Sequence, residues 1–137
     1  MENDRIRQSD LPDVLALAFL GDAIFSHAVR SNLVARGISR SGELTRLSLA
    51  YVTAEAQSEG FLLVEPDLTE DEKAIAHHAS NSRHLNRPRG TAAVDYRRAT
   101  ALEALLGMLE VTGQTDRLKD LLDRLLSELS HRETELP

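Results

Sequence analysis

The chain has 137 residues, with 16 Lys and Arg against 22 Asp and Glu, no cysteine, and a net charge of −6. The absence of cysteine excludes a disulfide scaffold, a zinc ribbon and thiol catalysis. Hydrophobic residues at 42% and charged residues at 28% are typical of a globular domain. We therefore expect one domain over residues 1–137, with its core at about residues 11–130 and polar ends.

Neither a membrane span nor a targeting signal is expected. The first ten residues, MENDRIRQSD, contain no apolar stretch, and no uncharged run reaches the ~20 apolar residues that a membrane-spanning helix needs. The sequence therefore predicts a cytoplasmic protein with no membrane partner.

The apolar residues recur with helical spacing from the start of the chain. Asp10 and Pro12 predict a helix start, and the apolar run 14–20 then reaches Gly21 and Asp22. A second helical pattern continues to Gly37, which is a typical residue after a helix end. The spacing next predicts a helix over residues 43–59, stopped by Gly60, and a connection over residues 61–68.

A capping box, with Thr69 three residues before Glu72, predicts a helix that runs toward Ala79. Residues 81–93 form the one long predicted loop. Helices are predicted over residues 94–111 and, after Gly113, along a leucine stripe, with a polar tail that frays after Ser130. No alternating strand pattern occurs, so the fold class is all-α.

Positive charge is concentrated in and after the long loop. Five of the arginines lie between Arg83 and Arg98 with a single acid, whereas the rest of the chain has a net charge of −10. This strip can meet a polyanion although the whole chain is acidic. A solvated loop whose arginines pair with nearby acids explains the pattern equally well.

Two carboxylates stand out because each is the one charged residue of an apolar helical segment. Asp22 lies within residues 15–25, and Glu103 lies within residues 99–109. A carboxylate half-buried among apolar groups costs several kcal/mol unless a backbone amide, an arginine or a metal ion compensates it. For Asp22 alone the simplest partner is a backbone amide, as an N-cap after Gly21. For Glu103 alone it is an arginine such as Arg30.

Taken together, the two acids suggest a shared hard cation, since Mg²⁺ takes oxygen ligands and few of them from protein. Glu103 lies on a stripe of polar and small residues with Tyr96, Thr100 and Gly107. Gly107 would let another helix approach closely, so Glu103 is expected to face a helix that carries Asp22. A histidine metal site at His77, His78 and His84 is a weaker interpretation, because adjacent residues point about 100° apart on a helix.

At these residues the chain resembles a known family. The segment LAFLGDAIF (residues 17–25) resembles the signature of the ribonuclease III endonuclease domain, and LEALLG (102–107) resembles its second acidic motif. The absence of a double-stranded-RNA-binding domain from the 137 residues, and the stretch YRRATALEALLG (96–107), resemble the Mini-ribonuclease III family. Residues 51–57 and 68–72 are also similar to its central segments, so the resemblance covers about residues 15–122.

The resemblance implies an all-α homodimer that cuts both strands of double-stranded RNA with Mg²⁺, for which Mn²⁺ can substitute. It implies that Asp22 and Glu103 are the catalytic and metal-binding acids. It also implies a role in maturing the ends of the 23S ribosomal RNA precursor, with a ribosomal protein as a further candidate partner. The RNA-binding candidates are Asn81, Arg83, Arg87, Arg89 and Arg97.

One difference from the full-length enzymes fits the Mini family, and one segment departs from the family pattern. Full-length ribonuclease III enzymes carry two further acids at the positions of Ala18 and Thr100, which the Mini enzymes also lack. The family's basic Arg-Gly-Arg-Asn segment is His78-Ala79-Ser80-Asn81 here, so only its asparagine is kept and its two arginines are lost. The alternatives are a non-catalytic dimeric helical module that binds structured RNA or a ribosomal partner, and a purely structural adaptor.

Overall fold

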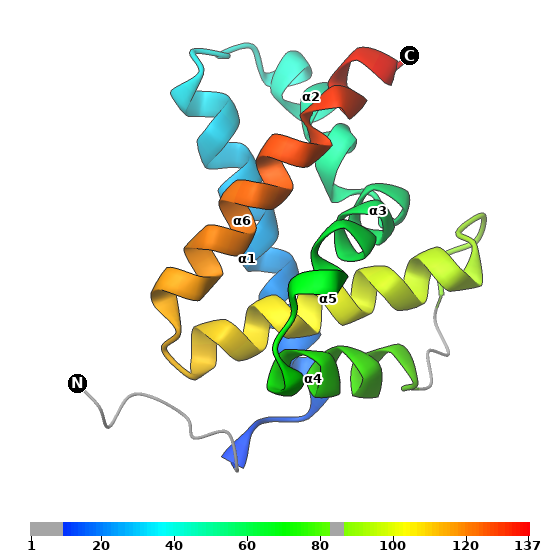
Figure 1. Ribbon diagram of the computed structural model, residues 1–137. Helices are drawn as coiled ribbons and strands as arrows, with labels where there is room; N and C mark the ends of the chain where they lie inside the picture. The colour runs from blue at the N-terminus through cyan, green and yellow to red at the C-terminus, as the bar shows by residue number, and fades with distance from the viewer. Residues whose placement is uncertain (1–9, 83–86) are drawn as a thin grey trace.

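The computed structural model describes residues 10–82 and 87–137, and within these ranges the secondary structure is entirely helical (Figure 1). The all-α prediction is therefore confirmed. The elements in chain order are α1 (Val14–Ala35), α2 (Ser41–Val52), α3 (Ala54–Val64), the 3₁₀ helix η3 (Glu65–Asp67), α4 (Glu70–Ser80), α5 (Ala93–Val111), α6 (Thr115–Leu129) and the 3₁₀ helix η4 (Ser130–Glu135).

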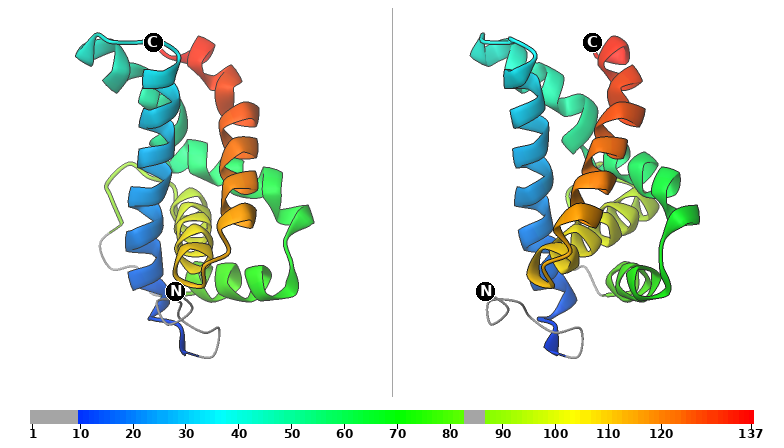
Figure 2. Two further views of the ribbon diagram at one scale, coloured as in Figure 1. Left: turned by 90° about the vertical axis from the view of Figure 1, so that its left-hand side faces the viewer. Right: turned by 60° about the vertical axis from the view of Figure 1, so that its left-hand side comes forward.

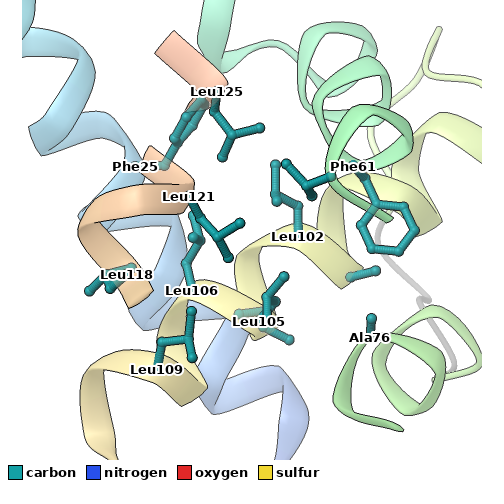
Figure 3. Packing of buried hydrophobic residues seen from close by; sticks show 14 of the residues in the cluster. Phe25, Phe61, Ala76, Leu102, Leu105, Leu106, Leu109, Leu118, Leu121 and Leu125 are labelled. Atoms are coloured by element: carbon teal, nitrogen blue, oxygen red, sulfur yellow. The ribbon is translucent and has the colours of Figure 1, made fainter. Parts of the chain in front are cut away.

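Helix α5 is the centre of the bundle. It crosses the molecule with α1, α3, α4 and α6 packed around it (Figures 1 and 2). A helix that is apolar on all sides must be buried on all sides, and α5 buries nearly every residue of its second half. Figure 3 shows Leu102, Leu105, Leu106 and Leu109 of α5 among side chains of α1, α3, α4 and α6.

Two glycines set the distance between α1 and α5. A Cβ atom on Gly107 of α5 would lie 2.0 Å from the Leu17 carbonyl oxygen of α1. A Cβ atom on Gly21 of α1 would lie 1.7 Å from the Glu103 carbonyl oxygen of α5. The two backbones therefore touch where the helices cross, and no larger residue fits at either position. The close approach predicted for Gly107 is confirmed.

The predicted break at Gly21 and Asp22 is wrong, because α1 runs through both residues as one helix. Its N-cap is Asp13, whose carboxylate accepts a hydrogen bond from the Leu15 amide at 3.0 Å, and not Asp10. Glycine inside a helix costs roughly 0.5–1 kcal/mol relative to alanine. The contact with α5 offsets that cost, and a single sequence does not display such a contact.

The predicted helix over residues 43–59 is also wrong, because it is divided into α2 and α3 at Thr53. Thr53 has an extended backbone with ψ 157°, and its hydroxyl accepts a hydrogen bond from the Ala56 amide at 3.2 Å. It is therefore an N-cap in the middle of the apolar pattern. Gly60 does not end a helix but lies inside α3, against Leu125 of α6.

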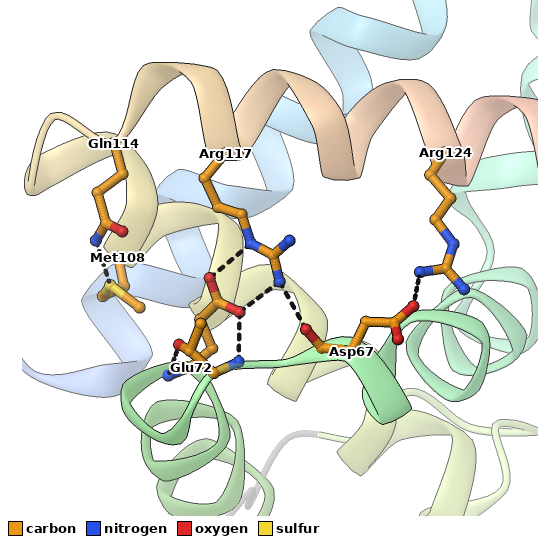
Figure 4. A network of polar contacts seen from close by, with 7 residues as sticks. Asp67, Glu72, Met108, Gln114, Arg117 and Arg124 are labelled. Atoms are coloured by element: carbon orange, nitrogen blue, oxygen red, sulfur yellow. Dashed lines mark hydrogen bonds and ion pairs between the residues drawn. The ribbon is translucent and has the colours of Figure 1, made fainter.

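The capping box at the start of α4 is confirmed and belongs to a larger polar network. Glu72 accepts from the Thr69 amide at 2.9 Å and from Arg117 of α6 at 2.7 and 2.8 Å (Figure 4). Arg117 also donates to the Asp67 carbonyl at 3.0 Å, and Arg124 binds the Asp67 carboxylate. The Glu72 side chain is only 2% exposed, so its charge depends on these partners.

The polar tail does not fray as predicted but folds into η4 against α2. Arg36, at the end of α1, donates to both carboxylate oxygens of Glu133 at 2.8 and 2.9 Å, and the Tyr51 hydroxyl donates to the same carboxylate. Burial and the contact with Glu133 raise the pKa of Tyr51 to about 12, so it remains a donor at neutral pH. Arg132 binds Glu59 at 2.9 Å. The last residues therefore join α1, α2 and α3.

The length and composition of α1 would allow it to cross a membrane, with 22 residues and a mean hydropathy of 1.3 in its most apolar window. Its apolar residues have another explanation in this fold. Seven of its residues, from Val14 to Leu33, are buried in the bundle, and the helix packs along α5. Burial in the core therefore accounts for part of its apolar character, while Leu15, Phe19 and Val34 remain exposed.

We predict that Gly107→Ala lowers the free energy of unfolding by at least about 2 kcal/mol, because the new methyl group must separate α1 from α5. Gly42→Ala in α2 is the matched control, since nothing lies within 4 Å of its Cβ position. It should leave stability unchanged or raise it by up to about 1 kcal/mol. Urea unfolding followed by circular dichroism measures both. Equal midpoints for Gly107→Ala and the wild-type chain would contradict the backbone contact.

Candidate functional site

A hollow of about 280 Å³ lies beside the crossing of α1 and α5. We call it the acidic hollow, and its lining residues are Leu15, Ala18, Phe19, Asp22, Tyr96, Thr100 and Glu103. On each helix these residues are spaced three or four apart, which places them on one face. Asp22 and Glu103 are its two acids, and the prediction that Glu103 faces the helix carrying Asp22 is confirmed.

The glycine contact explains why the two acids meet. The Gly21 Cα lies against the Glu103 backbone, and Asp22 is the next residue of α1. The side chains of Asp22 and Glu103 therefore leave the crossing on the same side and enter the same hollow. From the sequence, Gly21 before Asp22 predicts a break between two helices. In the structure, Gly21 instead brings Asp22 close to Glu103.

The electrostatics of the pair are unusual for carboxylates. Burial and then the charge and hydrogen bonding of Asp22 raise the pKa of Glu103 to about 8, while a hydrogen bond from the Gln57 amide opposes the rise. Without a cation, Glu103 is therefore mostly protonated at neutral pH, next to an exposed Asp22. Two acids that cannot both ionise cheaply form a site that gains from a divalent cation.

The two simpler explanations for these acids fail. Asp22 lies in the middle of α1 and caps no helix. Within residues 10–82 and 87–137, Glu103 forms no ion pair with Arg30 or with any other arginine. Arg30 lines a different hollow, between α1 and α2. Among the described residues, the side chains that interact with Glu103 are Asp22 and Gln57.

The donor set fits a hard cation that keeps most of its water. Two carboxylates supply oxygen ligands, and no group of three or more His, Asp or Glu that could hold a metal converges in the part of the chain that the structure describes. Mg²⁺ commonly binds through one or two carboxylates, with water and substrate phosphates as its other ligands. The histidine interpretation gains no support, since His77 is hydrogen-bonded to Asn81 at 2.9 Å and His84 lies outside the described residues.

Ala18 and Thr100 occupy the same hollow as the two acids. These are the positions at which the resemblance places two further acids in full-length ribonuclease III enzymes. Ala18 is apolar, and the Thr100 hydroxyl donates to the Tyr96 carbonyl at 2.9 Å within α5. The site thus has two carboxylates because the other two positions are occupied by side chains without charge.

The described RNA-binding candidates are exposed and lie on three different segments. Arg97 is exposed on α5 directly after Tyr96, a residue of the hollow, whereas Asn81 is the exposed C-cap of α4. Arg87 and Arg89 are exposed on the connection before α5, and Arg83 lies outside the described residues. Their role in RNA binding remains a prediction.

Two features of the site are absent from the sequence-based prediction. Gln57 of α3 is buried and interacts with Glu103. In the sequence, the one indication of this role is that Gln57 is polar within the apolar pattern of residues 54–64. Phe19 is 84% exposed beside Asp22, and no pattern in the sequence distinguishes it from a core phenylalanine such as Phe25.

Comparison with known proteins agrees with this geometry. A family model described as the Ribonuclease III domain matches residues 15–114, the region that contains both acids and both crossing glycines. The class of protein that the fold and the two-acid site define is thus the ribonuclease III endonuclease domain.

Similar proteins identify the family within the ribonuclease III class. "Mini-ribonuclease 3" of Brevibacillus brevis is 36% identical over 86% of this chain and 88% of its own length. A "Mini-ribonuclease 3-like protein" of Ilyobacter polytropus is 39% identical over 87% of this chain and 94% of its own length. A crystal structure of a Fusobacterium nucleatum protein superposes with a TM-score of 0.80 at 28% identity, over 90% and 98% of the two chains. The chain belongs to the Mini-ribonuclease 3 family, a family of ribonuclease III-type endoribonucleases.

We predict that the protonation of Glu103 makes the folded protein less stable as the pH rises. Its folded pKa of about 8 lies above the ordinary value of 4.5, so the folded, metal-free protein holds the extra proton between those pH values. Its free energy of unfolding should therefore fall as the pH rises from about 4.5 to about 8. Glu103→Gln should remove this slope and be more stable than the wild-type chain at pH 8.

Urea unfolding at several pH values in a chelating buffer measures this difference. Glu110→Gln is the matched control, because Glu110 is exposed on the same helix, and it should keep the wild-type slope. A Glu103→Gln curve parallel to that of the wild-type chain would show that Glu103 ionises as an ordinary surface acid.

Proposed function

We propose that this chain is a Mg²⁺-dependent endoribonuclease that cleaves both strands of double-stranded RNA. The observation that carries the proposal is the meeting of Asp22 and Glu103 in one hollow, without a basic partner for Glu103 among the described residues. Family membership gives the reaction class, and the chemistry of two adjacent carboxylates favours a divalent cation. Mn²⁺ takes oxygen ligands in the same geometry and is the expected substitute.

Asp22 and Glu103 would hold the cation, and each has a separate task. Asp22 is exposed and offers its oxygens to the hollow, while Glu103 must lose its proton before it can bind. Bound Mg²⁺ supplies an activated water and offsets the charge that develops on the scissile phosphate. Thr100 and Ala18 line the hollow without charge, so water and phosphate oxygens would complete the ligands of the cation.

The basic strip would supply the affinity for RNA that an acidic chain otherwise lacks. Arg97 is exposed and follows Tyr96, a residue that lines the acidic hollow, and would contact a phosphate near the cleaved bond, while Arg87 and Arg89 would extend the strip along the preceding connection. Asn81 and Arg83 complete the set that we propose. Contacts of this kind read the A-form backbone more than the base sequence.

We also propose that the active form is a homodimer. Leu15 and Phe19 are 43% and 84% exposed, and they share one face of α1 with Asp22. An exposed aromatic residue beside a polar site is expensive in water, and a second copy of the chain would cover it. The same contact would bring two acidic hollows together, one for each strand of the duplex.

The proposed substrate is the precursor of the 23S ribosomal RNA, in the cytoplasm, with a ribosomal protein as a further partner. The support for this is the resemblance to the Mini-ribonuclease III family. A non-catalytic helical dimer that binds structured RNA or a ribosomal partner is the second candidate. It is favoured by one observation, the replacement of the family's basic segment by His78-Ala79-Ser80-Asn81.

We predict that Asp22→Asn abolishes Mg²⁺-dependent cleavage of a ~40-bp double-stranded RNA and leaves the helical content unchanged, because Asp22 is exposed and removing its charge disturbs no packing. Gel analysis of the RNA with and without Mg²⁺ measures cleavage, and Asp120→Asn on the exposed face of α6 is the control. Full cleavage by Asp22→Asn would remove Asp22 from the mechanism. A wild-type chain that binds the RNA without cutting it would favour the non-catalytic candidate.

We predict that Arg97→Ala weakens RNA binding and reduces the slope of log affinity against log salt concentration by about 1, as expected for one lost phosphate contact. Binding is measured by fluorescence anisotropy with Asp22→Asn present in every protein to prevent cleavage. Arg46→Ala is the control, because Arg46 pairs with Glu43 on α2 at 2.8 Å. An unchanged slope for Arg97→Ala would place the RNA elsewhere.

We predict that Phe19→Ser converts the homodimer to a monomer, because it removes the largest exposed apolar side chain beside the acidic hollow. Light scattering after size-exclusion chromatography measures the mass. Leu62→Ser is the control, since Leu62 is 45% exposed on α3, and it should remain dimeric. A dimer that survives Phe19→Ser would place the interface on another face.

A further inference from the structure

Gln57 of α3 is a buried amide beside the acidic hollow, with a side chain that is 3% exposed. Its Nε2 donates to the Val52 carbonyl, near the end of α2, at 3.2 Å. The same amide lies close enough to the Glu103 carboxyl group to lower its pKa. It does not line the hollow, so it reaches the site only through Glu103.

The amide oxygen makes Gln57 exceptional. Its Oε1 is the one buried side-chain nitrogen or oxygen atom without a hydrogen-bond partner in the described residues. A buried polar atom without a partner is costly, and an apolar side chain of similar shape would avoid the cost. The packing between α3 and α5 therefore does not explain an amide at this position, whereas its contact with Glu103 does.

The Val52 carbonyl fixes the orientation of the amide, and Gln57 lowers the pKa of Glu103, which is the effect of an N–H donor. A carbonyl accepts only from an N–H group, so Nε2 must face Val52. Nε2 carries a second proton, and this one is available to the Glu103 carboxylate. The break between α2 and α3 at Thr53 thus has a consequence at the site, because it places the Val52 carbonyl where Gln57 can use it.

We propose that Gln57 is a positioning residue that holds the Glu103 carboxylate in the orientation needed to bind a divalent cation together with Asp22. This inference rests on the proposed function. An arginine at this position would orient the Glu103 carboxylate equally well, but its positive charge would compete with the cation for the carboxylate. A neutral donor orients the carboxylate and leaves its charge for the metal, which is how outer residues support metal ligands.

The test uses Gln57→Leu and Gln57→Met in the full chain, with Mn²⁺ alone as the probe. Water-proton relaxation measures Mn²⁺ affinity without RNA, and cleavage of the ~40-bp RNA gives kcat and KM. We expect Mn²⁺ affinity to fall at least about 10-fold in both variants, as is typical when a partner of a metal ligand is lost. We expect kcat to fall by a similar factor and KM for RNA to remain unchanged.

A matched glutamine and a double variant separate positioning from a loss of structure. Gln114→Leu removes a glutamine that binds Thr112 at 2.8 Å after the end of α5, away from the hollow, and should keep wild-type Mn²⁺ affinity. In a Glu103→Gln chain, Gln57→Met should cause no further loss, because its effect passes through Glu103. A general loosening of the fold would instead add to the loss.

The outcomes separate the positioning role of Gln57 from the proposed nuclease activity. Wild-type Mn²⁺ affinity in Gln57→Leu or Gln57→Met overturns the positioning role and leaves the nuclease in place. An added loss in the double variant also overturns it. If Gln57→Leu does not fold, Gln57→Met, which keeps the unbranched shape, carries the test. A wild-type chain that neither binds Mn²⁺ nor cuts RNA overturns the proposed function itself.

Discussion

The contact between the backbones of α1 and α5 is the constraint on which the rest of this structure depends. Gly21 and Gly107 allow the backbones of the two helices to touch. A Cβ atom at either position would clash with the other helix, so the helices cross where these glycines lie. Around that crossing α5 is buried on all sides, so the other helices take their places against it. The same contact brings Asp22 and Glu103 to one hollow. Packing and chemistry are therefore set by one pair of glycines.

The electrostatics of the hollow follow from that geometry. A close helix contact excludes water from Glu103, and Asp22 adds a second negative charge beside it. In the free protein the repulsion is relieved by a proton, and in the proposed enzyme it is relieved by a cation. The binding of metal and the release of that proton are then linked, so the apparent metal affinity should depend on pH. Gln57 contributes the neutral hydrogen bond that keeps Glu103 directed toward the shared site.

Much of this arrangement was predictable from the sequence, and the exceptions have physical reasons. The capping box at Thr69 and Glu72 and the leucine stripe of α6 are local signals, and both are confirmed. Asp22 and Glu103 were identifiable because a lone charge in an apolar helix requires a partner. Gly21 was misread because its role depends on a residue 82 positions away in the chain, at Glu103. Thr53 and Gln57 were missed for a similar reason, since capping and partner choice are decided by tertiary contacts.

The tail shows the same limit. Residues 131–135 are polar, and composition alone predicts that they fray, yet Arg36 and Tyr51 together bind Glu133. Each of those partners lies far from the tail in sequence, and neither carries a pattern that identifies it. Local rules therefore described the helices well, whereas contacts between distant residues decided where they join.

The position of α5 in the chain also has a consequence for biosynthesis. Its residues, Ala93–Val111, leave the ribosome after those of α1, α3 and α4, although they form the centre of the core. Until they emerge, the faces of α1, α3 and α4 that contact α5 lack this partner, and the tail that joins α1 to α2 is made later still. A nascent chain of this protein therefore exposes apolar surface for most of its synthesis. The core is therefore expected to close only after α5 is available, and the contacts of the tail follow.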